Sequence, residues 1–259
     1  MTAGHSTDEQ EVSAPRDTRR GWLMLGCFVV GEVTFLVASL LVVLPYALAS
    51  PRQPAAGSLP PAALVLVLLV PTVLAAVVAT TGAALLGQGN LVQRLRSQLS
   101  LRWRLSDVGV GLVLGVVGLV ITVPAAALWA RWVGTSEANS AVGEAFDGLR
   151  LPLGMALILF FGVWLVAPLC EEVLYRGVLW RAVEYWQWNR WVILGLTTAL
   201  FSVAHLELLR TPLLVVISLP IALARMLTGN LLASIVTHQA NNFLPAVGLL
   251  LITQGLVPG

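Results

Sequence analysis

Residues 152–187 read PLGMALILFFGVWLVAPLCEEVLYRGVLWRAVEYWQ, an apolar run that contains two adjacent glutamates. A helix of about 20 apolar residues crosses the hydrocarbon core of a bilayer, so this run is long enough to span it. An ionisable side chain inside a membrane costs roughly 3 kcal/mol or more, which makes Glu171 and Glu172 candidates for a functional role. The stretch therefore predicts a transmembrane helix that carries part of a site.

The composition of the whole chain agrees with a membrane protein. Of the 259 residues, 58% are hydrophobic and 11% are charged, and the mean hydropathy is +0.87. Soluble domains have about a quarter of their residues charged, so most of this surface must face lipid. The net charge of +2 and the lack of a basic stripe among aromatic residues argue against nucleic-acid binding.

Long apolar blocks outside residues 152–187 predict further membrane helices. The expected spans are 22–48, 62–87, 107–130, 152–187, 190–206, 211–227 and 230–254. The predicted fold is an all-α membrane protein, a polytopic bundle of about seven transmembrane helices with a buried polar site. We expect a polar cytoplasmic tail at 1–20, a region of three transmembrane helices at 21–150 and a catalytic four-helix membrane core at 151–259.

The arginines indicate the orientation of this bundle. With the N-terminus in the cytoplasm, eleven of the fifteen arginines lie on the cytoplasmic side and four on the other. Positive residues favour cytoplasmic loops, so we expect an integral protein of the plasma membrane with a cytoplasmic N-terminus. The basic segment 92–107 could be a short helix lying on anionic lipid, but an ordinary positive loop is the favoured interpretation.

Ionisable and amide side chains gather in the last four predicted spans. They are Glu171, Glu172, Arg176, His205, His238, Asn241 and Asn242. Polar residues on neighbouring helices can simply hold a bundle together, but a set of this size favours a shared site. Glu32 stands alone in the first span, where we expect a structural hydrogen bond or an accessory role.

Spacing predicts which of these side chains meet within a helix. Residues four apart lie on one helix face, so Glu172 and Arg176 are expected to pair. The same spacing puts Phe201 beside His205, where the ring can shield the imidazole.

Depth in the membrane predicts contacts between helices. Glu171 and His205 lie about equally far from the turn near residue 188, so antiparallel helices bring them to one level. His238 and Asn242, also four apart, come out somewhat shallower, and a tilted fourth helix would close the difference. One site inside the bundle is the expected result.

Three short motifs on separate helices carry a family resemblance. They read Glu171-Glu172-Val-Leu-Tyr-Arg176, Phe201-Ser-Val-Ala-His205 and His238-Gln-Ala-Asn-Asn242. In this order they resemble the CAAX-protease and bacteriocin-processing (CPBP, Abi) family of intramembrane glutamic endopeptidases. The resemblance covers about residues 151–254.

The resemblance implies a glutamate-dependent, type II CAAX protease-like peptidase, and we expect it to need no metal or other cofactor. Its implied catalytic residues are Glu171, Glu172, His205, His238 and Asn242, with Arg176 and Phe201 in support. Glu171 would deprotonate a water that His205 helps to hold. His238 and Asn242 would stabilise the oxyanion, and Glu172 could share the catalytic role.

Other functions remain open at this stage. The same glutamates and histidines could bind zinc, although the sequence lacks the His-Glu-x-x-His spacing of zinc peptidases. A non-proteolytic scaffold or bacteriocin-immunity-type relative could share the fold, and a proton-coupled transporter could use buried acids and histidines. For a peptidase we expect a peptide or lipidated-peptide substrate within the lipid bilayer.

Overall fold

The computed structural model describes residues 17–49, 59–134 and 138–257, and this part of the chain is helical and contains no strand. Six of its helices or continuous helical rods are long and apolar enough to cross a membrane. They are α1 (Thr18–Ala49), α2 (Pro61–Leu85), α4 (Leu105–Val133), the rod from α7 to α9 (Leu153–Tyr185), α11 (Thr211–Thr228) and α12 (Leu231–Gln254). The seventh, α10 (Arg190–Ala204), is also apolar but has only 15 residues. The predicted all-α membrane bundle is confirmed, and residues 1–16 of the expected tail lie outside the described residues.

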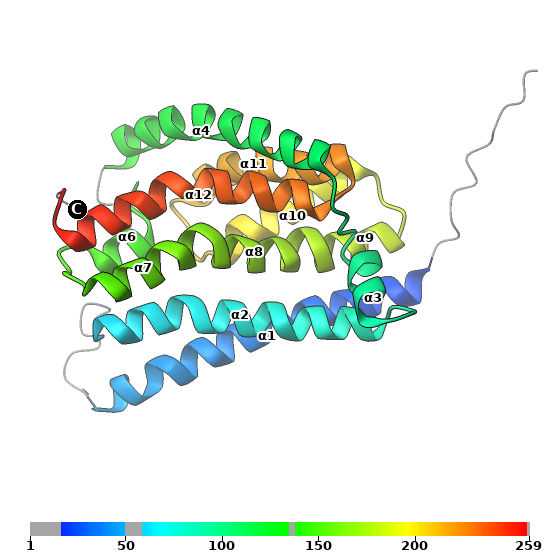
Figure 1. Cartoon of the computed structure of the whole chain (residues 1–259), viewed down its shortest axis with the longest axis horizontal. Helices are drawn as coiled ribbons and strands as arrows, with labels where there is room; N and C mark the ends of the chain where they lie inside the picture. Colours follow the sequence, from blue (N-terminus) through cyan, green and yellow to red (C-terminus); the bar gives the residue numbers. More distant parts are fainter. Residues whose placement is uncertain (1–16, 50–58, 135–137, 258–259) are drawn as a thin grey trace, which may run out of the picture.

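The rod from α7 to α9 occupies the middle of the bundle. Figure 1 shows it between the α1–α2 hairpin on one side and α12 on the other, with α4 packed over α11 and α12. α10 forms a hairpin with α11 on the same side as α12. Side chains of the rod can therefore contact most of the other helices.

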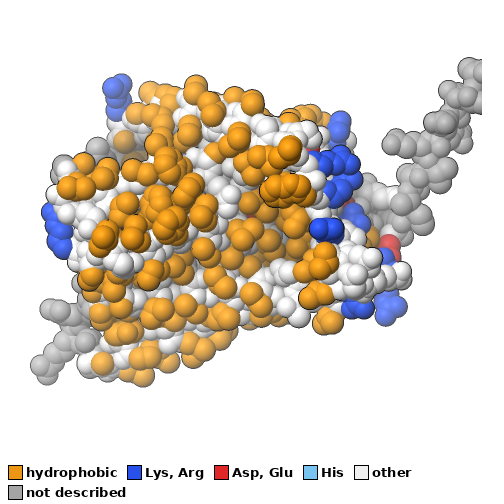
Figure 2. Space-filling model, in the orientation of Figure 1, with side chains coloured by type: hydrophobic (Ala, Val, Ile, Leu, Met, Phe, Trp, Pro, Cys, Tyr) orange, Lys and Arg blue, Asp and Glu red, His pale blue; other side chains and the backbone are white. Residues whose placement is uncertain are grey.

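The outer surface is apolar along the length of the helices. Large apolar side chains on α1 and α4 are widely exposed, among them Leu40, Leu41, Val113 and Val116. Figure 2 shows hydrophobic side chains over most of one face, with arginines toward its ends. Such a surface is stable only against lipid, so composition and structure agree on a membrane protein.

The central rod is not a uniform α-helix. It runs through α7 (Leu153–Phe161), the π-helical turn η2 (Gly162–Val166), α8 (Ala167–Glu172), the π-helical turn η3 (Val173–Leu179) and α9 (Trp180–Tyr185). Pro168 has no backbone N–H, and the Ala167 N–H bonds the carbonyl of Gly162, five residues back. π-Helical turns often occur at functional sites, and the two here enclose the helix that ends in Glu171 and Glu172.

Two short helices lie in the connections. α3 (Leu91–Gln98) begins at a capping box in which Asn90 and Gln93 bond each other's backbone N–H, so the first half of the basic segment 92–107 is helical, and its contact with lipid stays a prediction. α6 (Ala141–Phe146) starts at Ser140 and was not predicted. Six residues are too few to give a clear hydrophobic period.

Glycines let α4 approach α12 closely. A Cβ atom at Gly115 would lie 2.5 Å from the Cβ of Ala240, and one at Gly118 would lie 2.6 Å from Oδ1 of Asn241. Between the same helices, the Thr237 hydroxyl donates to the Gly111 carbonyl at 3.0 Å. Small residues at a helix contact allow this backbone approach in membranes.

We expect Gly115→Ala to destabilise the α4–α12 contact by about 1–3 kcal/mol, because the added methyl group overpacks it. The measurement is the thermal unfolding midpoint in detergent. Gly109→Ala is the matched control, since a Cβ at Gly109 on the same helix meets nothing within 4 Å. Equal midpoints for the two variants would contradict the close packing.

Candidate functional site

Glu172 lies at the centre of a buried polar cluster. Its Oε1 accepts a hydrogen bond from Nη1 of Arg176 at 3.0 Å and contacts Nδ1 of His238 at 2.9 Å. The side chains of Glu172 and Arg176 are completely buried, so the predicted pair forms in a region where water does not screen it. This pair joins α8 to η3, and His238 links it to α12.

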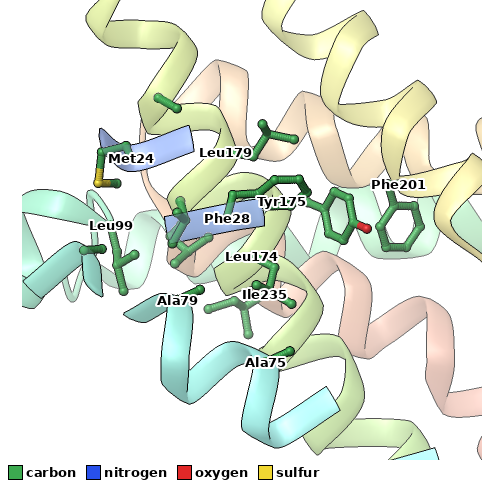
Figure 3. Close-up of a cluster of buried hydrophobic side chains, with 14 residues drawn as sticks. Met24, Phe28, Ala75, Ala79, Leu99, Leu174, Tyr175, Leu179, Phe201 and Ile235 are labelled. Atoms are coloured by element: carbon green, nitrogen blue, oxygen red, sulfur yellow. The ribbon is translucent and has the colours of Figure 1, made fainter. Parts of the chain in front are cut away.

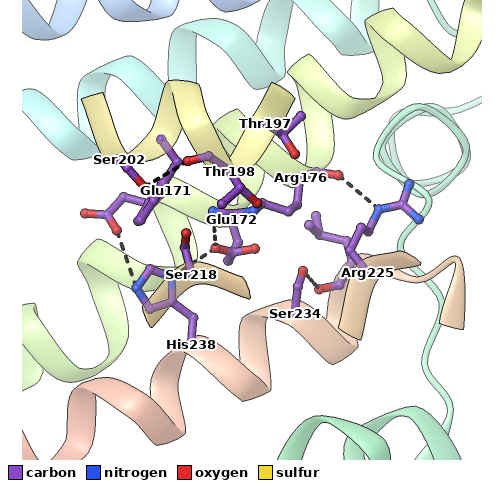
Figure 4. A network of polar contacts seen from close by, with 12 residues as sticks. Glu171, Glu172, Arg176, Thr197, Thr198, Ser202, Ser218, Arg225, Ser234 and His238 are labelled. Carbon is purple, nitrogen blue, oxygen red and sulfur yellow. Dashed lines mark hydrogen bonds and ion pairs between the residues drawn. The ribbon is translucent and has the colours of Figure 1, made fainter. Parts of the chain in front are cut away.

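Glu171 has different surroundings from its neighbour. Its side chain is 25% exposed, and its Oε2 lies 3.6 Å from Nε2 of His238. The imidazole of His238 therefore lies with one nitrogen toward each glutamate, as Figure 4 shows. The distance to Glu171 is slightly long for a hydrogen bond, so both atoms retain the capacity to bond a third group.

The Phe201 ring connects the remaining aromatic and charged groups. The guanidinium carbon of Arg176 lies 4.4 Å from the ring centroid, a cation–π contact. The imidazoles of His205 and His238 lie edge-on to the ring, with centroids at 4.7 and 5.7 Å. The ring thus covers the buried imidazole of His238, whereas His205 touches the ring but stays exposed, so the predicted shielding of His205 is not seen.

His205 stands at the end of α10. Its Nδ1 lies 2.8 Å from the carbonyl oxygen of Phe201, one turn back in the chain. A carbonyl oxygen only accepts, so Nδ1 carries a proton, and in neutral His205 the lone pair is on Nε2. Nε2 can therefore accept a hydrogen bond or a proton.

Asn242 is bound to the backbone of the central rod. Its Nδ2 donates to the carbonyl oxygen of Val163 in η2 at 3.2 Å. In the described residues no hydrogen bond joins Asn242 to the glutamates or histidines of the cluster. One amide hydrogen of Asn242 is thereby used, and the second is free to donate.

Sequence reasoning missed a second buried arginine beside the cluster. Nε of Arg225 on α11 donates to the carbonyl oxygen of Arg176 at 3.0 Å, and its Nη2 lies 3.6 Å from Oε1 of Glu184. Its position near the end of an apolar span is a visible signal of a buried charge, but an arginine there also fits the positive-inside pattern that indicates the orientation. Figure 4 shows Arg225 approaching η3 from α11.

The arrangement of the possible metal ligands indicates whether a metal ion could bind. Over the ranges that the structure describes, no three side chains of His, Cys, Asp or Glu are grouped so as to hold a metal ion. Glu172 instead bonds Arg176 and His238. The arrangement resembles an acid–base site more than a coordination sphere.

Replacing Arg176 with Met is expected to destabilise the protein by about 3–5 kcal/mol, because Glu172 is left as an uncompensated buried charge. Adding Glu172→Gln should restore part of this loss. Thermal unfolding in detergent measures both effects. The control is Arg20→Met, whose exposed pair with Asp17 should contribute less than about 1 kcal/mol. A midpoint for Arg176→Met as high as that of the control would refute the role of the ion pair.

Comparison with known proteins addresses the family. No curated protein and no solved structure matches the chain. Residues 153–244, from the start of α7 into α12, match the model of the family described as type II CAAX prenyl endopeptidase Rce1-like. This family suggests a CAAX-type intramembrane protease, and the matched stretch contains all three motifs. The segment 153–244 is therefore similar to the Rce1-like type II CAAX prenyl endopeptidase family, in agreement with the resemblance of its motifs.

Proposed function

We propose that the protein is an intramembrane endopeptidase that hydrolyses a peptide bond of a membrane-associated or hydrophobic peptide with an activated water. The observation that carries this proposal is the imidazole of His238 between the carboxylates of Glu171 and Glu172 inside an apolar bundle. A base, a proton carrier and a charged partner are then within reach of one water.

The two glutamates have separate tasks in this proposal. Glu172 is fixed by Arg176 and His238, so its charge orients the imidazole. Among the described residues Glu171 has no arginine partner, and it is partly exposed, which suits a general base. Glu172 would act on the reaction mainly by holding His238 in place.

The reaction would proceed by general base catalysis. Glu171 takes a proton from the water as its oxygen attacks the carbonyl carbon, and the carbonyl oxygen becomes an oxyanion. The proton on Glu171 then passes to the amide nitrogen, the carbon–nitrogen bond breaks, and a carboxylic acid and an amine leave. Balance requires one water for each bond cleaved.

Donors around the cluster would stabilise the oxyanion. Fixed donors in a site without bulk water stabilise developing charge by several kcal/mol more than water does, roughly 3 kcal/mol for one donor. With its Nδ1 bonded to Glu172, His238 would donate to the oxyanion from Nε2 in the protonated form, and Asn242 has one amide hydrogen beyond its bond to Val163. His205, with Nε2 free of the Phe201 carbonyl, would help to hold the water.

The substrate class and orientation are part of the same proposal. A site within apolar helices favours a lipidated or hydrophobic peptide that reaches it through the bilayer. The excess of arginines on one side supports a plasma-membrane protein with its N-terminus in the cytoplasm.

Glu171→Gln and His205→Ala are expected to reduce peptide cleavage by about 10²–10⁴-fold, because the first removes the base and the second removes a group that holds the water. The assay is cleavage of a library of hydrophobic and lipidated peptides by the purified protein in detergent. Glu144→Gln, an exposed acid in α6, is the control and should cleave normally. Undiminished turnover by a folded Glu171→Gln protein would refute the peptidase and favour a scaffold.

We also expect cleavage to survive dialysis against a strong chelator, since the proposed steps use only carboxylates, imidazoles and amides. Metal analysis of the purified protein should find far less than one zinc ion per chain. Stoichiometric zinc, together with activity that chelation removes and zinc restores, would instead establish a zinc peptidase.

A further inference from the structure

The first helix brings a third glutamate toward the cluster, from outside the segment that matches the family. Glu32 lies fourteen residues after Thr18 at the start of α1, and Glu171 lies fourteen residues before Tyr185 at the end of α9. Thr18 and Tyr185 mark helix ends that lie on the same side of the bundle in Figure 1. Because the rise per residue is similar in the two helices, the two acids lie at a similar depth, about 20 Å from that side. An acid at that depth is costly unless something uses it.

α1 packs directly against the part of the rod that follows Glu171 and Glu172. A Cβ atom at Gly31 would lie 3.0 Å from the Leu174 side chain and 3.2 Å from the Ala75 carbonyl oxygen. One turn before Glu32, the Phe28 ring meets the Tyr175 ring edge-on with centroids 5.3 Å apart. The backbone of α1 is thus held beside η3.

The carboxyl group of Glu32 faces groups that belong to the site. From its place on α1 against η3 it interacts with the Tyr175 hydroxyl, and electrostatically with Glu171 and His205. Glu32 is therefore not the isolated acid that the sequence suggested. It is the contribution of the first helix to the cluster.

Tyr175 connects Glu32 to the imidazoles. Its ring lies edge-on to Phe201 with centroids 5.3 Å apart, and Figure 3 shows its hydroxyl on the Phe201 side. Phe201 in turn contacts the rings of His205 and His238. If the Tyr175 ring moved, the Phe201 ring would lose one of the contacts that hold it in place.

We propose that Glu32 is a positioning residue of the site, which holds the Tyr175 hydroxyl and thereby sets Phe201 and the two imidazoles. This inference rests on the proposed peptidase. A carboxylate accepts a shorter and stronger hydrogen bond from that hydroxyl than an uncharged Gln does, whereas Gln would suffice for a bond that only holds the fold, at lower cost in the membrane. The charge of Glu32 is therefore what separates a positioning role from a structural one.

The test compares Glu32→Gln, Tyr175→Phe and the double variant, using the full chain in detergent and a hydrophobic peptide that the wild type cleaves. We expect each single variant to lower kcat about tenfold with KM changed less than about twofold. The double variant should be no slower than the slower single one, because the two residues act as a unit. Thr34→Val is the matched control on α1, since its hydroxyl bonds only its own helix, at Val30.

Two results would overturn the inference. One is a kcat for Glu32→Gln equal to that of the Thr34→Val control, and the other is losses that multiply in the double variant. Thermal midpoints of the wild type, the two single variants and the double variant test the contact itself, because replacing Glu32 should change the midpoint less when Tyr175 is already Phe. An equal change in both backgrounds would refute the contact.

The same experiment separates this inference from the proposed function. An inactive Glu171→Gln protein beside a fully active Glu32→Gln protein would refute the role of Glu32 alone. Full cleavage by Glu171→Gln would refute the peptidase assignment, whatever Glu32 does.

Discussion

The buried ion pair between Glu172 and Arg176 is the constraint on which the rest of the structure depends. Neither side chain is exposed, in a protein whose outer surface is apolar. Charges in such surroundings are tolerated only when they are paired and enclosed by protein. The pair therefore requires α8 and η3 to lie in the middle of the bundle, with α1 and α2 on one side and α10, α11 and α12 on the other. Once that packing exists, His238 on α12 can reach Glu172.

Most of the fold could be predicted from the sequence, because in a bilayer the length of an apolar run determines the length of a helix. Asn189 and Asn230 cap α10 and α12 within two residues of the predicted starts. The π-helical turns could not be predicted, since a change of hydrogen-bonding register leaves no mark in hydropathy. The capping box at Asn90 and Gln93 was readable, and giving it more weight would have revealed α3.

For the site, contacts within one helix were easier to predict than contacts between helices. The pair Glu172–Arg176 followed from spacing alone, because residues four apart share a face. The orientation of His238 between two acids depends on the rotation of α12 against α8, which no local pattern reports. The hydrogen bond from Asn242 to the Val163 carbonyl depends on the same rotation of α12. Counting residues from the helix ends also places Glu32 at the depth of Glu171. The prediction compared depths only within the last four spans, so it left Glu32 isolated.

The adjacency of Glu171 and Glu172 explains how one helix can supply both a fixed charge and a reactive one. Neighbouring residues on a helix point about 100° apart, so one carboxylate can face the interior while the other faces the edge of the site. Here the inner one is fixed through its Oε1 by Arg176 and His238, and the outer one can still accept a hydrogen bond or a proton at a partly exposed position. A single glutamate could not do both, because the bonds that fix a carboxylate also reduce its ability to accept a proton. The imidazole of His238 lies between the two carboxylates and makes their roles dependent on each other. If one carboxylate shifts, the ring moves with it, and so does the ring nitrogen that faces the second carboxylate.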